Sequence, residues 1–164
     1  MFILPALFAF VLVVLGPAVK GFYYSFTDWN GIGKNAVFVG ISNYGKLLSD
    51  SRFWNSFLFT FVFAICSVIC INAVGFGLPL VAPAFAIGLF LSISDSFKMF
   101  DQNLSLTAGG PANSTEMIAL NIYNTAFKES KLGQAQTKAV VFLIVVVVIS
   151  VTQLILSKRK EVEM

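Results

Sequence analysis

Histidine is absent from this 164-residue chain, and cysteine is limited to Cys66 and Cys70. The chain therefore lacks the commonest general base and a usual metal ligand, and we find no pairing of a nucleophile with a base. The two cysteines lie four residues apart in an apolar segment, so we expect buried apolar thiols, with no disulfide and no metal. No Walker-type Gly-Lys-Ser/Thr motif is present either. We expect no enzymatic activity and no cofactor bound by this chain.

Charged residues are also scarce, at 12% of the chain against 57% hydrophobic residues. The mean hydropathy of +0.85 is typical of an integral membrane protein. Between Phe53 and Ser94 there is no charged side chain, and this run of roughly 42 residues is about twice what one helix needs to cross a bilayer. The net charge of +3 reflects basic residues beside spans, so we expect a lipid bilayer and no nucleic acid as a partner.

The apolar pattern predicts an all-α membrane protein that forms a single domain over residues 1–164. About four transmembrane helices are expected, at residues 2–20, 54–76, 79–100 and 138–157. The second and third would turn near Gly75 to Pro79, where glycine and proline interrupt the apolar run. A basic tail follows the last span, so both termini are expected in the cytoplasm, although the outer loops 21–53 and 101–137 also carry basic residues.

The second outer loop predicts a short extracytoplasmic helix. Asn113 has the residue type of an N-cap, and Glu116 follows it by three residues as in a capping box. We expect this helix to start at Asn113 and to stop near Gly133. In the first outer loop, Asp50 or Ser49 can cap the second span.

Three stretches of the chain carry a resemblance to a known family, in the expected order and each beside the expected span. The first lies in the first outer loop and comprises residues 24–29 and the segment from 38–40 to Trp54. The second comprises residues 96–101, 109–111 and 114–116, and the third comprises residues 122–123 and 126–127. The chain resembles the permease subunit of binding-protein-dependent ABC importers for carbohydrates, the branch of the maltose-type and glycerol-3-phosphate-type permeases. The outer-loop motif within the second stretch is Gly109, Gly110, Pro111, Thr115 and Glu116.

The resemblance implies a set of partners and a location. A second permease subunit, an ATP-binding cassette ATPase dimer that holds the ATP, and an extracytoplasmic sugar-binding protein are expected, in the bacterial cytoplasmic (inner) membrane. The four spans would correspond to helices 1, 2, 5 and 6 of the six-helix permease core. Leu78, Pro79 and Pro83 resemble the end of the cytoplasmic loop that contacts the ATPase. The rest of that loop and two helices have no counterpart, so the chain resembles an internally shortened permease.

Two interpretations of the polar residues near the third span stay open. By resemblance, residues 96–99 match the sugar site of the maltose-type permease, and polar groups at membrane depth favour a functional role. Asp95 and Lys98 are three residues apart and can pair on the helix surface, which lowers the cost of burying either. Alternatively, these residues lie at the outer interface, where charge is tolerated. The substrate-pathway candidates are Ser92, Asp95, Ser96, Phe97, Lys98, Met99 and Asp101.

Three hypotheses for function follow. The chain is a permease subunit that imports sugars or related solutes, a transport-inactive derivative without the ATPase-coupling loop, or an unrelated small four-helix membrane protein. The three matched stretches favour the first two, and the missing coupling loop favours the second where activity is concerned.

Overall fold

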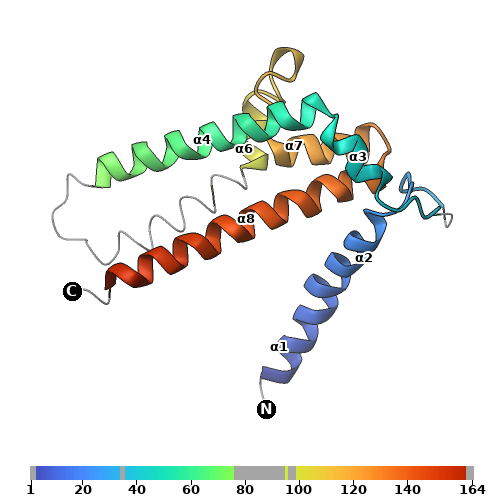
Figure 1. Cartoon of the computed structure of the whole chain (residues 1–164), viewed down its shortest axis with the longest axis horizontal. Helices are drawn as coiled ribbons and strands as arrows, with labels where there is room; N and C mark the ends of the chain where they lie inside the picture. Colours follow the sequence, from blue (N-terminus) through green and yellow to red (C-terminus); the bar gives the residue numbers. More distant parts are fainter. Residues whose placement is uncertain (1–2, 34–35, 76–94, 96–98, 162–164) are drawn as a thin grey trace. The chain divides into compact units, whose positions relative to one another are not determined.

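The computed structural model describes residues 3–33, 36–75, 95 and 99–161 of the chain (Figure 1). The elements are α1 (Ile3–Phe10), the π-helical segment η1 (Val11–Leu15), α2 (Gly16–Tyr24), α3 (Ser42–Leu48), α4 (Ser51–Gly75), α6 (Phe100–Leu106), the 3-10 turn η2 (Pro111–Asn113), α7 (Ile118–Tyr123), the π-helical segment η3 (Asn124–Lys128) and α8 (Leu132–Glu161). Within these ranges the β-structure is one isolated bridge between Thr27 and Phe38. The predicted all-α class is confirmed.

Three of the helical runs are long and apolar enough to cross a membrane. They cover Leu4–Tyr24, Ser51–Cys70 and Leu132–Thr152, with mean hydropathies of 2.0, 2.0 and 2.2. Each overlaps one of the predicted spans. The third predicted span, at 79–100, falls almost entirely outside the described residues, as does the predicted turn after Gly75. The number of four spans therefore stays a prediction.

The first span contains a single π-helical turn, and proline explains it. Gly16 donates its backbone N–H to the Val11 carbonyl, five residues back. Pro17 follows at the start of α2; it has no N–H to donate, and its ring would crowd the carbonyl four residues earlier. The wider turn lets the helix continue past Pro17 without a break.

The chain divides into two compact units, and the first comprises residues 1–50 and 122–141. Its centre is the buried backbone at Ser25, just after α2. The Ser25 carbonyl accepts hydrogen bonds from Asn43 Nδ2 at 3.0 Å and from Thr137 Oγ1 at 2.9 Å. Asn43 also donates to the Thr27 carbonyl at 2.8 Å. These bonds fasten α3 and the first turns of α8 to the end of the first span.

Gly133 lies where α8 packs most tightly against the loop that follows α2. Its N–H donates to the Trp29 carbonyl at 2.9 Å, and a Cβ at this position would overlap the Thr27 carbonyl oxygen. Only glycine permits this close approach of two backbones. Because the contact forms here, α8 already begins at Leu132, before the predicted span at 138–157.

The second unit comprises residues 51–121 and 142–164. The buried face of α4 repeats about every four residues, at Phe53, Ser56, Thr60 and Ala64, as expected for one side of an α-helix. Large apolar side chains such as Leu58 and Ile65 are exposed elsewhere on α4, which suits a helix surrounded by lipid or by other helices. The expectation that Cys66 and Cys70 are buried is wrong for this chain alone, because both are free thiols exposed on α4.

The predicted helix start at Asn113 is also wrong. Ala112 and Asn113 have positive φ angles of 53° and 60°, which a continuing right-handed helix does not allow. The chain makes the short turn η2 there, and α7 begins only at Ile118. The helical run then ends at Lys128, and α8 starts separately at Leu132, so it does not continue to Gly133.

Candidate functional site: the loop between α6 and α7

The loop at 107–117 belongs to the second unit and owes its path to two adjacent glycines. Gly109 and Gly110 have φ angles of 95° and 66°, a region that favours glycine. A Cβ on Gly110 would lie 2.5 Å from Thr115 Oγ1, so any other residue there would displace Thr115. Pro111 opens η2 directly afterwards. The sequence motif therefore encodes a tight double bend.

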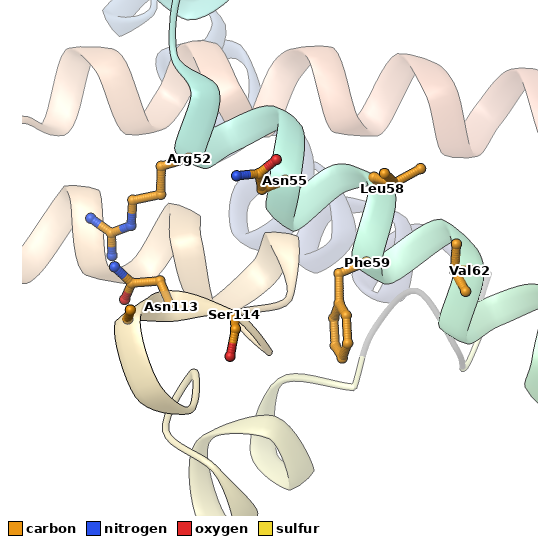
Figure 2. A pocket seen from close by; sticks show the side chains of 8 residues that line it. Arg52, Asn55, Leu58, Phe59, Val62, Asn113 and Ser114 are labelled. Atoms are coloured by element: carbon orange, nitrogen blue, oxygen red, sulfur yellow. The ribbon is translucent and has the colours of Figure 1, made fainter.

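The tip of this loop faces the first three turns of α4 across a pocket of about 630 Å³ (Figure 2). Asn113 and Ser114 line it from the loop, while Arg52, Asn55 and Phe59 line it from α4. Figure 2 shows Phe59 projecting from α4 toward the loop. The pocket thus joins polar groups at the Ser51 end of α4 to an apolar wall along the helix.

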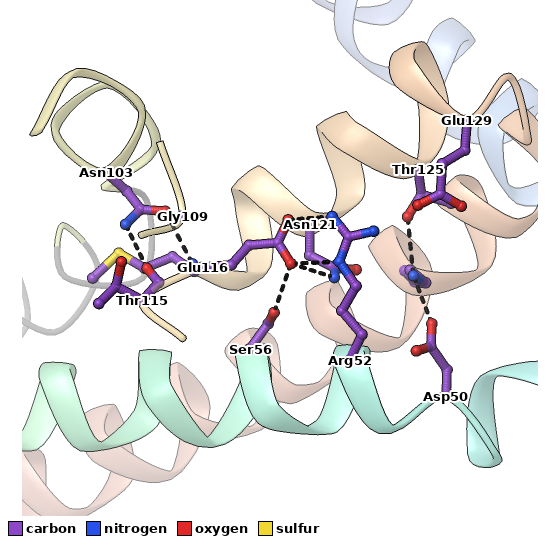
Figure 3. Close-up of polar contacts among 12 residues, drawn as sticks. Asp50, Arg52, Ser56, Asn103, Gly109, Thr115, Glu116, Asn121, Thr125 and Glu129 are labelled. Carbon is purple, nitrogen blue, oxygen red and sulfur yellow. Dashed lines mark hydrogen bonds and ion pairs between the residues drawn. The ribbon is translucent and has the colours of Figure 1, made fainter. Parts of the chain in front are cut away.

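Glu116, near the end of the loop, is the centre of a buried polar cluster (Figure 3). Its side chain is fully buried, and its carboxylate accepts two bonds from Arg52, Nη2 to Oε1 at 2.6 Å and Nε to Oε2 at 2.8 Å. Asn121 Nδ2 donates to Oε2 at 3.0 Å, and Ser56 Oγ approaches the same oxygen at 3.4 Å. A buried carboxylate is stable only when charge and hydrogen bonds compensate its lost hydration. The two-pronged Arg52 contact supplies both.

Two further contacts fix the backbone on either side of Glu116. Asn103, in α6, donates through Nδ2 to the Thr115 carbonyl at 2.7 Å and accepts the Met117 N–H through Oδ1 at 3.0 Å. Thr60, in α4, accepts the Ile118 N–H through Oγ1 at 2.9 Å. Because the first N–H groups of α7 have no partner within their own helix, the Thr60 hydroxyl takes the place of a cap. The loop is therefore held by both α4 and α6.

The structure brings the outer-loop candidates together, and three of the substrate-pathway candidates are among the residues it describes. Asp95 is exposed, Met99 is half-buried just before α6, and Asp101 is exposed in the first turn of α6. These three show no contact with the Glu116 cluster in the part of the chain that is described. Outside the described residues lie Ser92, Ser96, Phe97, Lys98, Leu78, Pro79 and Pro83. Their predicted roles stay predictions, as does a pair between Asp95 and Lys98.

Sequence reasoning missed the partners of Glu116, which are Arg52, Ser56 and Asn121. One signal was available for α4. Arg52, Ser56 and Thr60 are spaced by four residues in a largely apolar span, so they share one helix face. Polar residues on one face of such a span indicate a buried contact, although the spacing alone does not identify what they contact.

A second buried ion pair lies within the first unit. Lys138 Nζ contacts Asp50 Oδ2 at 2.8 Å and Thr125 Oγ1 at 3.0 Å. The lysine side chain is 6% exposed and the aspartate side chain 28%. Asp50 directly precedes α4, the position expected for its cap, and its carboxylate compensates a lysine in the first turns of α8.

No family model matches the chain, but several individual proteins do. The "Probable starch degradation products transport system permease protein AmyD" of Thermoanaerobacterium thermosulfurigenes is 31% identical over 278 residues, covering all of this chain and 95% of the relative. The "Multiple sugar-binding transport system permease protein MsmF" of Streptococcus mutans is 38% identical over 85 residues, 52% of this chain and 29% of the relative. The "Probable ABC transporter permease protein y4oQ" of Sinorhizobium fredii is 38% identical over 97 residues, 56% of this chain and 31% of the relative.

The alignment with the Thermoanaerobacterium protein also shows that this chain is shorter than the region over which the two are aligned. It runs over 278 residues and includes this chain from end to end, whereas the chain has 164 residues. The relative's additional residues therefore fall inside the aligned region. This agrees with the interpretation of the chain as internally shortened.

Proposed function

We propose a role for this chain on the basis of its family, because the chain belongs to the permease subunits of carbohydrate ABC transporters. We infer that it forms one transmembrane subunit of an importer in the bacterial cytoplasmic membrane. A second permease, an ATPase dimer that binds and hydrolyses ATP, and an extracytoplasmic sugar-binding protein would complete the assembly. Both termini would lie in the cytoplasm, and the loop between α6 and α7 would lie outside.

The observation that carries this proposal is the loop held by the buried Glu116 cluster. The Gly109-Gly110-Pro111 bend and Glu116 belong to the motif by which the chain resembles these permeases, and here they form an anchored, folded structure. The exposed apolar surfaces give further support. No residue is buried in the apolar 18-residue stretch within Leu4–Tyr24, so this helix needs lipid or a partner subunit around it.

Reconstitution tests the proposal directly. The full chain would be expressed with the second permease, ATPase and sugar-binding protein of the same genome and placed in proteoliposomes. We expect uptake of radiolabelled maltotriose that requires ATP inside, the binding protein outside and this chain in the membrane. Liposomes without the ATPase subunit are the matched control. Uptake that is equal with and without this chain would contradict the proposal.

A second candidate function is favoured by the alignment. Because residues of the Thermoanaerobacterium relative have no counterpart inside this chain, the segment expected to contact the ATPase is reduced to the stretch around Leu78 and Pro79. In that case the chain would insert into the membrane and retain the outer loop, but it would be inactive in transport. Capture of the ATPase by the affinity-tagged chain distinguishes the two candidates: an inactive derivative captures none.

A further inference from the structure

The pocket between α4 and the tip of the loop combines polar and apolar side chains. Its polar groups are the side chains of Arg52, Asn55, Asn113 and Ser114, and its volume of about 630 Å³ lies in the range of small-molecule sites. The amides of Asn55 and Asn113 are exposed and make no hydrogen bond to any part of the chain that the structure describes. Two amides therefore offer both donors and acceptors to a ligand.

The apolar side of the pocket comes from α4. Leu58, Phe59 and Val62 line it along the helix, and the Phe59 ring projects toward the loop (Figure 2). Figure 2 also shows Asn55 and Phe59 extending from successive turns of the same helix. An aromatic side chain beside amide and hydroxyl groups suits the C–H faces and the hydroxyls of a saccharide ring.

The charge of the pocket selects between ligand classes. Arg52 is the charged group that lines it, and its guanidinium is held by the fully buried Glu116 carboxylate through two atoms. The pair is neutral overall, so it does not favour a phosphate or a carboxylate, which an unpaired arginine would bind strongly. A neutral ligand with many hydroxyls fits better than an anion.

We propose that this pocket is a binding site for a neutral saccharide, formed by Asn55 and Phe59 of α4 with Asn113 and Ser114 of the loop. The inference rests on the proposed function in sugar import and adds a contact point made of other residues than the substrate-pathway candidates at 92–101. Few groups contribute and the pocket is open, so binding is expected to be weak, with a Kd of about 1 mM or above.

The experiment uses the full chain in nanodiscs with maltotriose as the probe, followed by saturation-transfer NMR. Asn113→Ala and Asn55→Ala should each raise the Kd about 3- to 10-fold, the effect of one lost hydrogen bond. Phe59→Leu keeps an apolar wall without the ring and should weaken binding to a similar extent. Gln102→Ala is the matched control, because Gln102 is an exposed amide in α6 outside the pocket, and it should leave the Kd unchanged. Circular dichroism and size exclusion check that each variant folds.

Three outcomes would overturn the inference. They are no response of the unmodified chain to maltotriose, a Kd that none of the pocket variants changes, and tighter binding of glucose 6-phosphate than of maltotriose. The last would mean that Arg52 acts as an anion-binding group. If the chain supports uptake in proteoliposomes but shows one of these results, the pocket assignment alone fails. If it binds maltotriose as described but captures no transporter subunit, the proposed function fails while the site stands.

Discussion

Replacing one partner of the Arg52–Glu116 pair at a time should destabilise the second unit unequally. Arg52→Met removes the guanidinium from the Glu116 carboxylate, which is 0% exposed and also accepts from the neutral donors Asn121 and Ser56. Loss of one partner of a buried ion pair costs about 3–5 kcal/mol, because the remaining charge has no compensation. We expect a cost in that range for Arg52→Met.

Glu116→Gln should cost less. The Arg52 side chain is 31% exposed, so its guanidinium can turn toward water once the carboxylate is gone. The expected loss is that of the charge-assisted hydrogen bonds, about 1.5–3 kcal/mol. In the double variant no charge is left without its partner. The loss of stability in the double variant should therefore be smaller than the sum of the two single losses by at least about 1 kcal/mol.

Equilibrium unfolding in mixed SDS micelles measures these differences. Trp54 in α4 reports on the unit when Trp29, the other tryptophan of the chain, is changed to Phe. Lys131→Met, read through Trp29 of the first unit in a chain that carries Trp54→Phe, is the control. Lys131 pairs with Glu129 at 3.0 Å but its side chain is 52% exposed, so the substitution should cost less than about 1 kcal/mol. A cost of Arg52→Met no larger than that of Lys131→Met, or smaller than that of Glu116→Gln, would refute the reasoning.

Two further substitutions test single contacts by the same unfolding assay, with Trp54 as the probe for the second unit and Trp29, in chains that carry Trp54→Phe, as the probe for the first. Gly133→Ala should destabilise the first unit by about 1–3 kcal/mol, because its Cβ would overlap a backbone carbonyl. The control is Gly45→Ala in α3, which has open space around it and should be neutral or stabilising by up to about 1 kcal/mol. Equal effects of the two substitutions would contradict the packing described for Gly133. Thr60→Val should cost about 1–3 kcal/mol by leaving the buried Ile118 N–H without its acceptor. The control Thr152→Val removes an exposed hydroxyl that donates to a carbonyl of the same helix, α8, and should change stability by less than about 0.5 kcal/mol. If Thr60→Val lowers stability no more than Thr152→Val does, the capping role of Thr60 is contradicted.

The sequence predicted the helical spans because their signal is local. The run of apolar residues that begins at Phe53 is enough to identify α4, whatever the rest of the chain does. The start of α8 at Leu132 was not predictable in the same way. It depends on Gly133 meeting the backbone at Thr27 and on Thr137 meeting Ser25, contacts between segments that are far apart in the chain.

The loop between α6 and α7 shows the same difference between features set by local sequence and features set by distant contacts. Gly109 and Gly110 indicated a bend, and the bend is there. Glu116 matched a capping box, yet its carboxylate is committed to Arg52, 64 residues earlier in the chain. A local pattern cannot reveal this competition, because the ion pair forms only after α4 and the loop have packed together. The interpretation of Asn113 as an N-cap failed for this reason, and the residue lies at the pocket instead.

Affinity purification of the full chain from membranes that also contain the second permease and the ATPase subunit tests the central claim most directly. If the chain is a working subunit of a carbohydrate importer, both partners should co-purify with it, and the ATPase should hydrolyse ATP faster when the sugar-loaded binding protein is added. A chain that inserts into the membrane and folds, but captures no ATPase, would contradict the claim and identify it as a transport-inactive derivative.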